Sequence, residues 1–186
     1  MATLVAEYGF RAVTLDQVLL RADLDHAAFS RHFERLDQCF ATIWSEVDNE
    51  LAARMTAAFQ AWTNWQDRLR AALLAGLVYM ASEPDRARLY IDEAVYVDDA
   101  LRDRQQAALS RLSEMIACGH EGDSDRGTRY ISEAICGAIW HRIQHYLRTG
   151  RGRDLPAEVP QLMYFAVLPY RGTDAAEAEL RRPLPR

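Results

Sequence analysis

Residues that could bind a metal are present in this chain, but their spacing fits metal chemistry poorly. His141 and His145 are four residues apart, so on a helix they would share one face and could both reach a zinc ion. No Glu, Asp or Cys follows at an obvious third position on that face. We therefore expect the pair to make polar contacts at an interface, and we predict no metal site there.

Ligand-type residues also crowd the short segment 118–125. The segment contains two glycines and is otherwise mostly polar, which is typical of a solvated loop. Its ligand-type residues are Cys118, His120, Glu121, Asp123 and Asp125. A run of carboxylates between Asp92 and Asp103 is explained by a helix end, a loop and a new helix, for which Asp98 is a good N-cap. A cationic ligand near this run is the alternative.

Serine, histidine and cysteine residues lack the surroundings that catalysis requires. No serine lies in a GxSxG motif, no histidine lies in an HExxH motif, and no glycine-rich phosphate loop occurs. The cysteines (Cys39, Cys118 and Cys136) are far apart and form no CxxC pair. We expect them to be reduced thiols of a cytoplasmic protein. The sequence therefore predicts neither an enzyme nor a bound cofactor.

The residues whose chemistry does fit a pattern lie near the N-terminus. His26, Ser30 and Arg31 can make hydrogen bonds, and helical spacing directs them outward if Phe29 and Phe33 face inward. Side chains of these types can read base edges or contact phosphates when a short helix presents them. This segment is therefore the first candidate for a functional surface.

Two capped helices and a tight turn would position that surface. Thr14-Leu-Asp-Gln17 fits a capping box, in which the Thr and Gln side chains satisfy each other's backbone amides. Ala22-Asp23-Leu24 is predicted to form the turn, with Leu24 filling the space between the helices. Asp25 can cap the next helix. Together these features indicate a helix-turn-helix.

The rest of the chain shows helical periodicity and no convincing alternating strand. Helices are predicted over about 37–62, 64–82, 86–94, 98–118, 126–148, 160–168 and 174–182. Pro160 starts the sixth of these, and Pro169 and Gly172 are expected to stop it. No apolar run approaches the roughly 18 residues of a membrane span. The predicted fold is all-α, with nine to ten helices and no membrane segment.

The order of these features resembles the TetR family of bacterial transcriptional regulators. The resemblance is strongest from Glu7 to Phe40, where glycine, Phe, Thr14, the turn and a terminal His32-Phe33 fall at family spacing. The segment from Val159 to Gly172 also looks like a common ending in this family. The resemblance implies a helix-turn-helix DNA-binding domain over 1–36, and a ligand-binding and dimerisation domain over 37–186.

The resemblance implies that this protein is a ligand-responsive regulator in the cytoplasm. It would be a repressor that binds a palindromic DNA operator as a homodimer and is released by a small, mostly apolar molecule. The segment Asp25–Phe33 would be its recognition helix, with Arg31 as the best hydrogen-bonding reader. The residues implied at the DNA are Thr14, Asp25, His26, Ala27, Ser30, Arg31, His32 and Arg35.

Three departures from the family pattern favour a second interpretation. Asp23 stands where the family usually has glycine, Ser30 where it often has tyrosine, and Leu36 where it usually has lysine. Residues 1–36 carry four arginines against five acidic residues, and the whole chain has a net charge of −5. Family members also commonly carry a further segment, often basic, ahead of the residue that corresponds to Met1. The alternative is a helical ligand- or partner-binding dimer with a degenerate DNA-binding head.

A predicted dimer face combines small residues with apolar ones. In the 126–148 helix, a stripe of small residues and histidines runs beside a stripe of isoleucines, and the 160–168 helix is apolar almost all round. Two such helices per chain suit a four-helix interface. The predicted interface residues are Ala134, Gly137, Ala138, His141, His145, Leu162 and Phe165. The alternative is that Leu162, Phe165 and Leu168 fill a thick monomer core.

Aromatic residues and methionines are frequent in the middle helices. Most are explained by core filling, but some could line a cavity, because ligand pockets in proteins are mostly apolar with a few polar groups. The candidates are Trp62, Trp65, Tyr79, Met80, Tyr90, Tyr96, Met115 and Trp140. A ligand bound there would be mostly hydrophobic or aromatic.

Overall fold

The computed structural model describes residues 1–93, 99–120 and 126–184, and this part of the chain is all-α without strands. The all-α prediction is therefore confirmed, and nine α-helices lie within the described ranges. In chain order the elements are α1 (Ala2–Tyr8), η1 (Phe10–Ala12), α2 (Leu15–Ala22), α3 (His26–Ser30), α4 (Leu36–Gln60), α5 (Trp65–Ser82), α6 (Pro84–Asp92), α7 (Asp99–Ala117), α8 (Arg126–Arg148), η3 (Gly152–Glu158) and α9 (Val159–Arg181).

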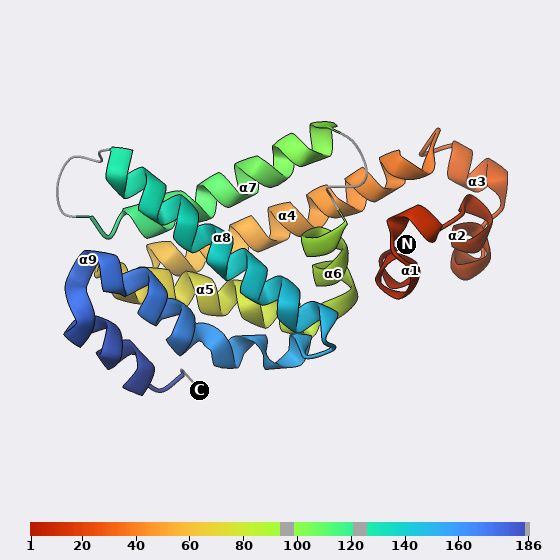
Figure 1. Ribbon diagram of the computed structural model, residues 1–186. Helices are drawn as coiled ribbons and strands as arrows, with labels where there is room; N and C mark the ends of the chain where they lie inside the picture. Colours follow the sequence, from red (N-terminus) through yellow and green to blue (C-terminus); the bar gives the residue numbers. More distant parts are fainter. Residues whose placement is uncertain (94–98, 121–125, 185–186) are drawn as a thin grey trace.

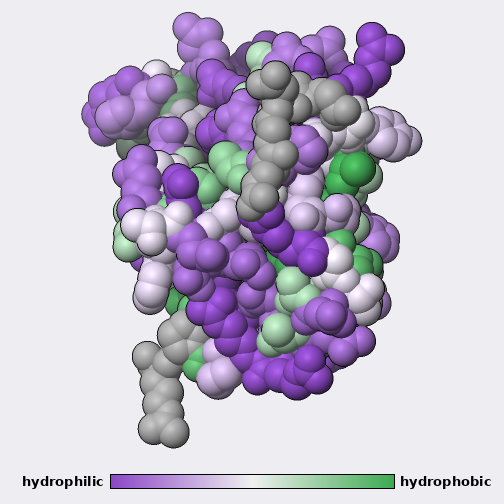
Figure 2. All heavy atoms as spheres, turned by 90° about the vertical axis from the view of Figure 1, so that its left-hand side faces the viewer, coloured by the Kyte–Doolittle hydropathy of each residue, from purple (hydrophilic) through white to green (hydrophobic). Residues whose placement is uncertain are grey.

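The helices form a small head and a larger body (Figure 1). We call residues 1–35, which contain α1 to α3, the head, and residues 36–184 the body. Helix α4 begins at the head and runs along the body, where it packs against α5 and α6. The end of the body farthest from the head is largely hydrophilic, with small separate hydrophobic areas (Figure 2).

One continuous apolar core holds the body together and reaches into the head. Phe40 and Trp44 of α4 are completely buried, and Leu4 and Val5 of α1 belong to the same core. A second, smaller cluster joins the head to the start of α4 and consists of Leu19, Phe29 and Cys39. The head therefore rests on the body through α1, α4 and Val18 of α2, while α3 is held by the small cluster.

Local capping explains where the helices of the head begin. Thr14 Oγ1 accepts a hydrogen bond from Gln17 N at 3.3 Å, and Gln17 Oε1 accepts one from Thr14 N at 2.9 Å. Asp25 Oδ1 accepts from Ala28 N at 2.7 Å, so α3 also starts at a capped residue. The predicted capping box and the predicted Asp25 cap are both confirmed.

Two local predictions are wrong. Leu24 does not fill the space between α2 and α3, because Leu19 and Phe29 already occupy it, and Leu24 is 49% exposed. Pro169 does not end a helix, since helical geometry continues through it. The predicted stop at Gly172 is confirmed, because φ is 77° there and α9 consists of two helices that meet at this kink. Pro169 lies on the exposed side, where water can replace the backbone hydrogen bond that proline cannot make.

The predictions made for Tyr96, Asp98, Glu121, Asp123 and Asp125 lie outside the described residues. Within the described ranges, no group of three or more His, Cys, Asp or Glu side chains is close enough to hold a metal ion. No helix in those ranges combines the length and the apolar composition that crossing a bilayer requires.

Candidate nucleic-acid interface and body cavity

Helix α3 presents a polar face to solvent. His26, Ala27, Ser30 and Arg31 are exposed, while Phe29 on the opposite side is 5% exposed and packs in the small cluster. The turn before α3 places Asp23 in the left-handed region, with φ 52° and ψ 48°. Aspartate adopts this conformation more readily than most residues, so the turn forms without the usual glycine. The outward direction of the predicted recognition residues is therefore confirmed.

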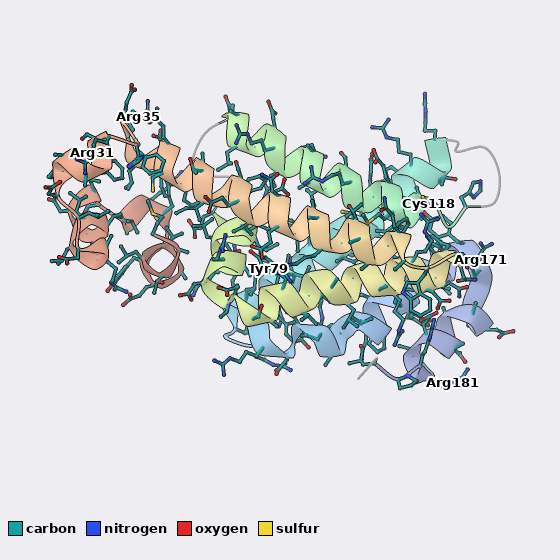
Figure 3. The ribbon with its side chains drawn as sticks, turned by 180° about the vertical axis from the view of Figure 1, so that it is seen from behind. Arg31, Arg35, Tyr79, Cys118, Arg171 and Arg181 are labelled. Atoms are coloured by element: carbon teal, nitrogen blue, oxygen red, sulfur yellow. The ribbon has the colours of Figure 1, made fainter. Side chains whose placement is uncertain are left out.

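Acidic side chains accompany several of the basic ones in the head. Arg21 pairs with Glu7 at 3.5 Å, and His26 Nε2 lies 3.4 Å from Asp16 Oδ1. Arg35 pairs with Asp37 at the start of α4. Arg31 has no ion-pair partner among the residues that the structure describes. Figure 3 shows Arg31 and Arg35 at the head end, far from Arg181.

Two hydrogen bonds connect the head and α4 to α6. Phe10 N donates to Glu93 Oε2 at 3.0 Å, just beyond the end of α6. Trp44 Nε1 donates to the carbonyl oxygen of Tyr90 at 3.1 Å, and the two rings stack with centroids 4.8 Å apart. The last turn of α6 therefore contacts both the head and the middle of the body.

A small apolar cavity of about 60 Å³ lies within the body, between α4, α5, α7 and α8. Met80, Tyr90 and Trp140 line it, so three of the predicted pocket residues come together. Met115 lines an adjoining hollow between α4 and α7, which shares Tyr90 with the cavity. The pocket prediction missed all the other wall residues, which are apolar or glycine: Leu51, Met55, Leu73, Gly76, Leu77, Ala108, Leu109, Leu112, Ile139 and Ile143.

Other predicted pocket residues lie elsewhere. Trp62 is 54% exposed and borders a separate surface groove on α5. Trp65 is buried, donates from Nε1 to the carbonyl oxygen of Met115 at 3.0 Å, and packs over Gly119, where a Cβ atom would come within 2.3 Å of its ring. Tyr79 donates to Glu50 Oε2 at 3.2 Å. These aromatic residues serve the core or the surface and not the cavity.

The predicted dimer face is exposed in the single chain. Ala134, Gly137, Ala138, His141 and His145 of α8 all lie at the surface, and Tyr130 and Ile131 are exposed nearer the start of the helix. On α9, Phe165 is 56% exposed, but Leu162 is 3% exposed and packs in the core of the chain. Leu162 therefore leaves the predicted interface, because its side of α9 is already covered.

Comparisons with known proteins support the fold. No protein-family model and no curated protein sequence matches the chain. Among solved structures, the chain is similar to a bacterial regulatory protein of the tetR family from Rhodococcus RHA1, with a TM-score of 0.70, 19% identity, and coverage of 89% of this chain and 92% of that one. It is also similar to a protein of unknown function from Rhodococcus sp. RHA1, with a TM-score of 0.60, 16% identity, and coverage of 87% and 89%. The chain therefore has the fold of the TetR family of regulators, as its sequence features predict.

Proposed function

We propose that this protein is a DNA-binding transcriptional regulator of the cytoplasm. In this proposal it is a repressor that binds a palindromic operator as a homodimer. A small, mostly apolar molecule that binds in the body releases the repressor from the operator. Residues 1–36 are the DNA-binding domain, and residues 37–186 are the ligand-binding and dimerisation domain.

The observation that carries the proposal is the exposed polar face of a capped α3 at the end of a helix-turn-helix. Arg31 stands on this face without an ion-pair partner among the described residues, so its guanidinium is available to a guanine edge or a phosphate. In the proposal, His26, Ala27, Ser30 and Arg31 face the bases, with Asp25 capping the helix. Thr14, His32 and Arg35 lie toward the phosphates.

The exposed α8 and α9 face supports the proposed homodimer. A partner helix can approach closely over Ala134, Gly137 and Ala138, where no long side chain intervenes. His141, His145 and Phe165 extend the same surface. Two copies related by a two-fold axis would each present one recognition helix. On a palindrome, such helices bind major grooves about 34–36 Å apart.

The position of the body cavity supports the proposed ligand response. Tyr90 lines the cavity, and its carbonyl oxygen holds Trp44 of α4, the helix that leads to the head. Glu93 in the next turn holds Phe10 of the head. A ligand that binds one arrangement of α4 and α6 better than another would change how the two heads are spaced.

An electrophoretic shift with the DNA upstream of the protein's own gene tests the proposal. Binding should be sequence-specific and should weaken steeply with salt. Arg31→Ala should weaken it roughly ten- to a hundredfold, because a good side-chain contact to a base contributes about 1–3 kcal/mol. Arg102→Ala is the matched control, since Arg102 is an exposed arginine of the body that pairs with Asp99 on its own helix.

The dimer is tested separately by sedimentation. Ala138→Arg puts a long charged side chain on the proposed interface and should raise the dimer dissociation constant at least about tenfold. Ala107→Arg, at an exposed position of α7, should leave it unchanged. Equal sedimentation of both variants as intact dimers would exclude this face.

A second candidate function is a ligand- or partner-binding dimer with a degenerate head. The pairing of Arg21 with Glu7 and of His26 with Asp16 favours it, because these contacts reduce the positive charge offered to phosphates. The absence of any shift at low salt, even with a basic segment added before Met1, would select this alternative.

A further inference from the structure

The body cavity continues toward the surface between α4 and α7. The cavity and the adjoining hollow of about 40 Å³ share five wall residues, so the two adjoin and together outline a path from the cavity to the gap between α4 and α7. These shared residues are Leu51, Met55, Tyr90, Ala108 and Leu112. Helices α4 and α7 run side by side in both ribbon views (Figures 1 and 3) but make few direct contacts. The outer end of this path is therefore bordered by two helices that long side chains, more than close backbones, join together.

Charged residues stand only at the outer end of the path among its described wall residues. Arg111 Nη2 lies 2.6 and 2.7 Å from the two carboxylate oxygens of Asp48, and Tyr90 donates its hydroxyl to Asp48 Oδ1 at 2.8 Å. Burial and the neighbouring Asp48 carboxylate raise the pKa of Tyr90 above its ordinary value, so its hydroxyl stays a neutral donor. The Asp48 side chain is 14% exposed and that of Arg111 is 43% exposed. Arg111 is thus the outer partner of the pair.

A second arginine of α7 bridges to α4 about one turn nearer the head than Asp48, beside the wall residues of the hollow. Arg104 Nη1 lies 2.6 Å from Ser45 Oγ of α4 and has no carboxylate partner among the described residues. Across this gap, Arg111 bonds to the Asp48 carboxylate, whereas Arg104 bonds to the uncharged Ser45 hydroxyl. Because Asp48 is already held by Arg111 and Tyr90, an added anion would meet unbalanced positive charge, whereas an added cation would meet repulsion.

We infer that the gap between α4 and α7 is the entrance to the cavity, and that the ligand is an amphipathic anion with a short apolar body and a carboxylate. The carboxylate would bind Arg111 and Arg104 at the entrance. The apolar body would pass Ala108 and Tyr90 toward Trp140. This inference rests on the proposed function in taking the cavity as the effector site.

The walls of the path restrict the size of the ligand. A cavity of about 60 Å³ is far smaller than the roughly 300–1,000 Å³ pockets that hold drug-sized ligands. Met55 and Met80 are the unbranched, adaptable side chains of the wall. Met55 packs closely on α5, since a Cβ atom on Gly76 would lie 3.0 Å from its sulfur. Met55 lines both the cavity and the hollow, so a ligand that occupies both passes it, and a short chain would do so with the least rearrangement.

Three probes with the same tail separate the effect of the charge from that of the cavity. Octanoate, octan-1-ol and octylammonium are titrated into the full chain without DNA, and binding is followed by calorimetry and by tryptophan fluorescence. We expect octanoate to bind at least about tenfold more tightly than the other two, because hydrogen bonds to charged groups contribute roughly 1.5–3 kcal/mol. Equal affinities, a preference for octylammonium, or no binding of any probe would overturn the inference.

Variants of the ion pair should shift the affinity in opposite directions. Arg111→Gln should weaken octanoate about tenfold and leave octanol within about twofold. Asp48→Asn should strengthen octanoate by about threefold or more, because it removes the competing carboxylate while an amide oxygen still accepts from Tyr90. Arg102→Gln on the same helix is the matched control. If Arg111→Gln weakens octanoate no more than Arg102→Gln does, the entrance is not at Arg111.

One more variant keeps the test decisive if Arg111→Gln fails to fold. Ala108→Leu occupies the path itself and should weaken octanoate and octanol alike, whereas Asp48→Asn changes octanoate alone. Unchanged binding in Ala108→Leu would place the apolar site elsewhere and overturn the inference. Because no DNA is present, a failed operator shift leaves these results standing. An operator shift combined with no preference for the anion would overturn this inference alone.

Discussion

The head and the body bury their apolar side chains in different ways. In the body, residues far apart in sequence share one core, so that Trp44 of α4 stacks on Tyr90 of α6, while Tyr90 in turn contacts Trp140 of α8. In the head, α2 and α3 begin at short caps and pack in the small cluster around Phe29, and Val18 is the one α2 residue of the main core. We infer that the geometry of the head is set locally and that of the body by long-range packing. Damage to the head should therefore stay local, whereas damage to the body should lower the stability of the whole chain.

The largest effect is expected from Trp44→Ala in the body. Trp44 is completely buried, and its indole donates to the Tyr90 carbonyl, which would be left without that donor. Truncating a buried Trp typically costs about 3–5 kcal/mol in the free energy of unfolding. Urea denaturation followed by circular dichroism measures the loss. Trp62→Ala, at a 54% exposed position, should change stability by less than about 0.5 kcal/mol. Similar losses for both would contradict a core centred on α4.

Phe29→Ala in the head should produce the next largest effect, confined to the head. The side chain is 5% exposed and shares its cluster with Leu19 and Cys39. We expect a loss of roughly 3 kcal/mol, at the lower end for this substitution because the cluster is small. Amide exchange should quicken over residues 15–33 while the body helices keep their protection. Faster exchange throughout α5 and α8 would show that head and body unfold together.

The features that could be predicted from the sequence are mainly those set by local contacts in the head. The caps at Thr14 and Asp25 each join a side chain to the backbone amide three residues later, and both predictions are confirmed. The inward turn of Phe29 follows from helical spacing alone and is confirmed as well. Leu24 was placed wrongly because its burial depends on how α2 and α3 are oriented after the turn, which no short pattern encodes.

The cavity was harder to predict, because it depends on how whole helices are rotated in the body. Trp62 and Trp140 look alike as residues in a helical pattern, yet Trp140 lines the cavity and Trp62 lies at the surface. Likewise, α9 is apolar all round near Leu162 and Phe165, and only packing decides that Leu162 faces the core. The missed wall residue Met55 belongs to the apolar stripe of α4, so its role could be found only once α5 and α7 were placed beside it.

Two helix N-caps, one in the head and one in the body, allow the two regions to be compared through smaller changes in stability. Thr14 caps α2 in the head, and Asn64 caps α5 in the body, where its side chain accepts hydrogen bonds from Gln66 N and Asp67 N. Replacing either residue with Ala should cost about 1 kcal/mol. Asn64→Ala should lower the midpoint of global unfolding, whereas Thr14→Ala should mainly quicken exchange in the head. If both variants shift the global midpoint equally, the head is no less cooperative than the body.

The smallest effect concerns acid stability, which we expect to involve the body more than the head. Burial of Glu158 opposes its ionisation, but hydrogen bonds from Arg142 Nε, at 2.7 Å, and from the Tyr146 hydroxyl outweigh it, so the pKa of Glu158 lies below its ordinary value of 4.5. The unfolded chain therefore binds a proton at higher pH than the folded chain does, and the contribution of Glu158 to stability is present above 4.5 and lost as the pH falls below it.

Glu158→Gln should accordingly flatten the pH dependence of the unfolding free energy below pH 4.5, as measured by urea denaturation at a series of pH values. Glu7→Gln is the control in the head, because Glu7 forms an exposed pair with Arg21 at 3.5 Å, and such pairs contribute only about 0–1 kcal/mol. For Glu7→Gln, the plot of unfolding free energy against pH should run nearly parallel to that of the unmodified protein. A flatter curve for Glu7→Gln than for Glu158→Gln would mean that the acid response resides in the head, and would reverse the contrast between the two regions.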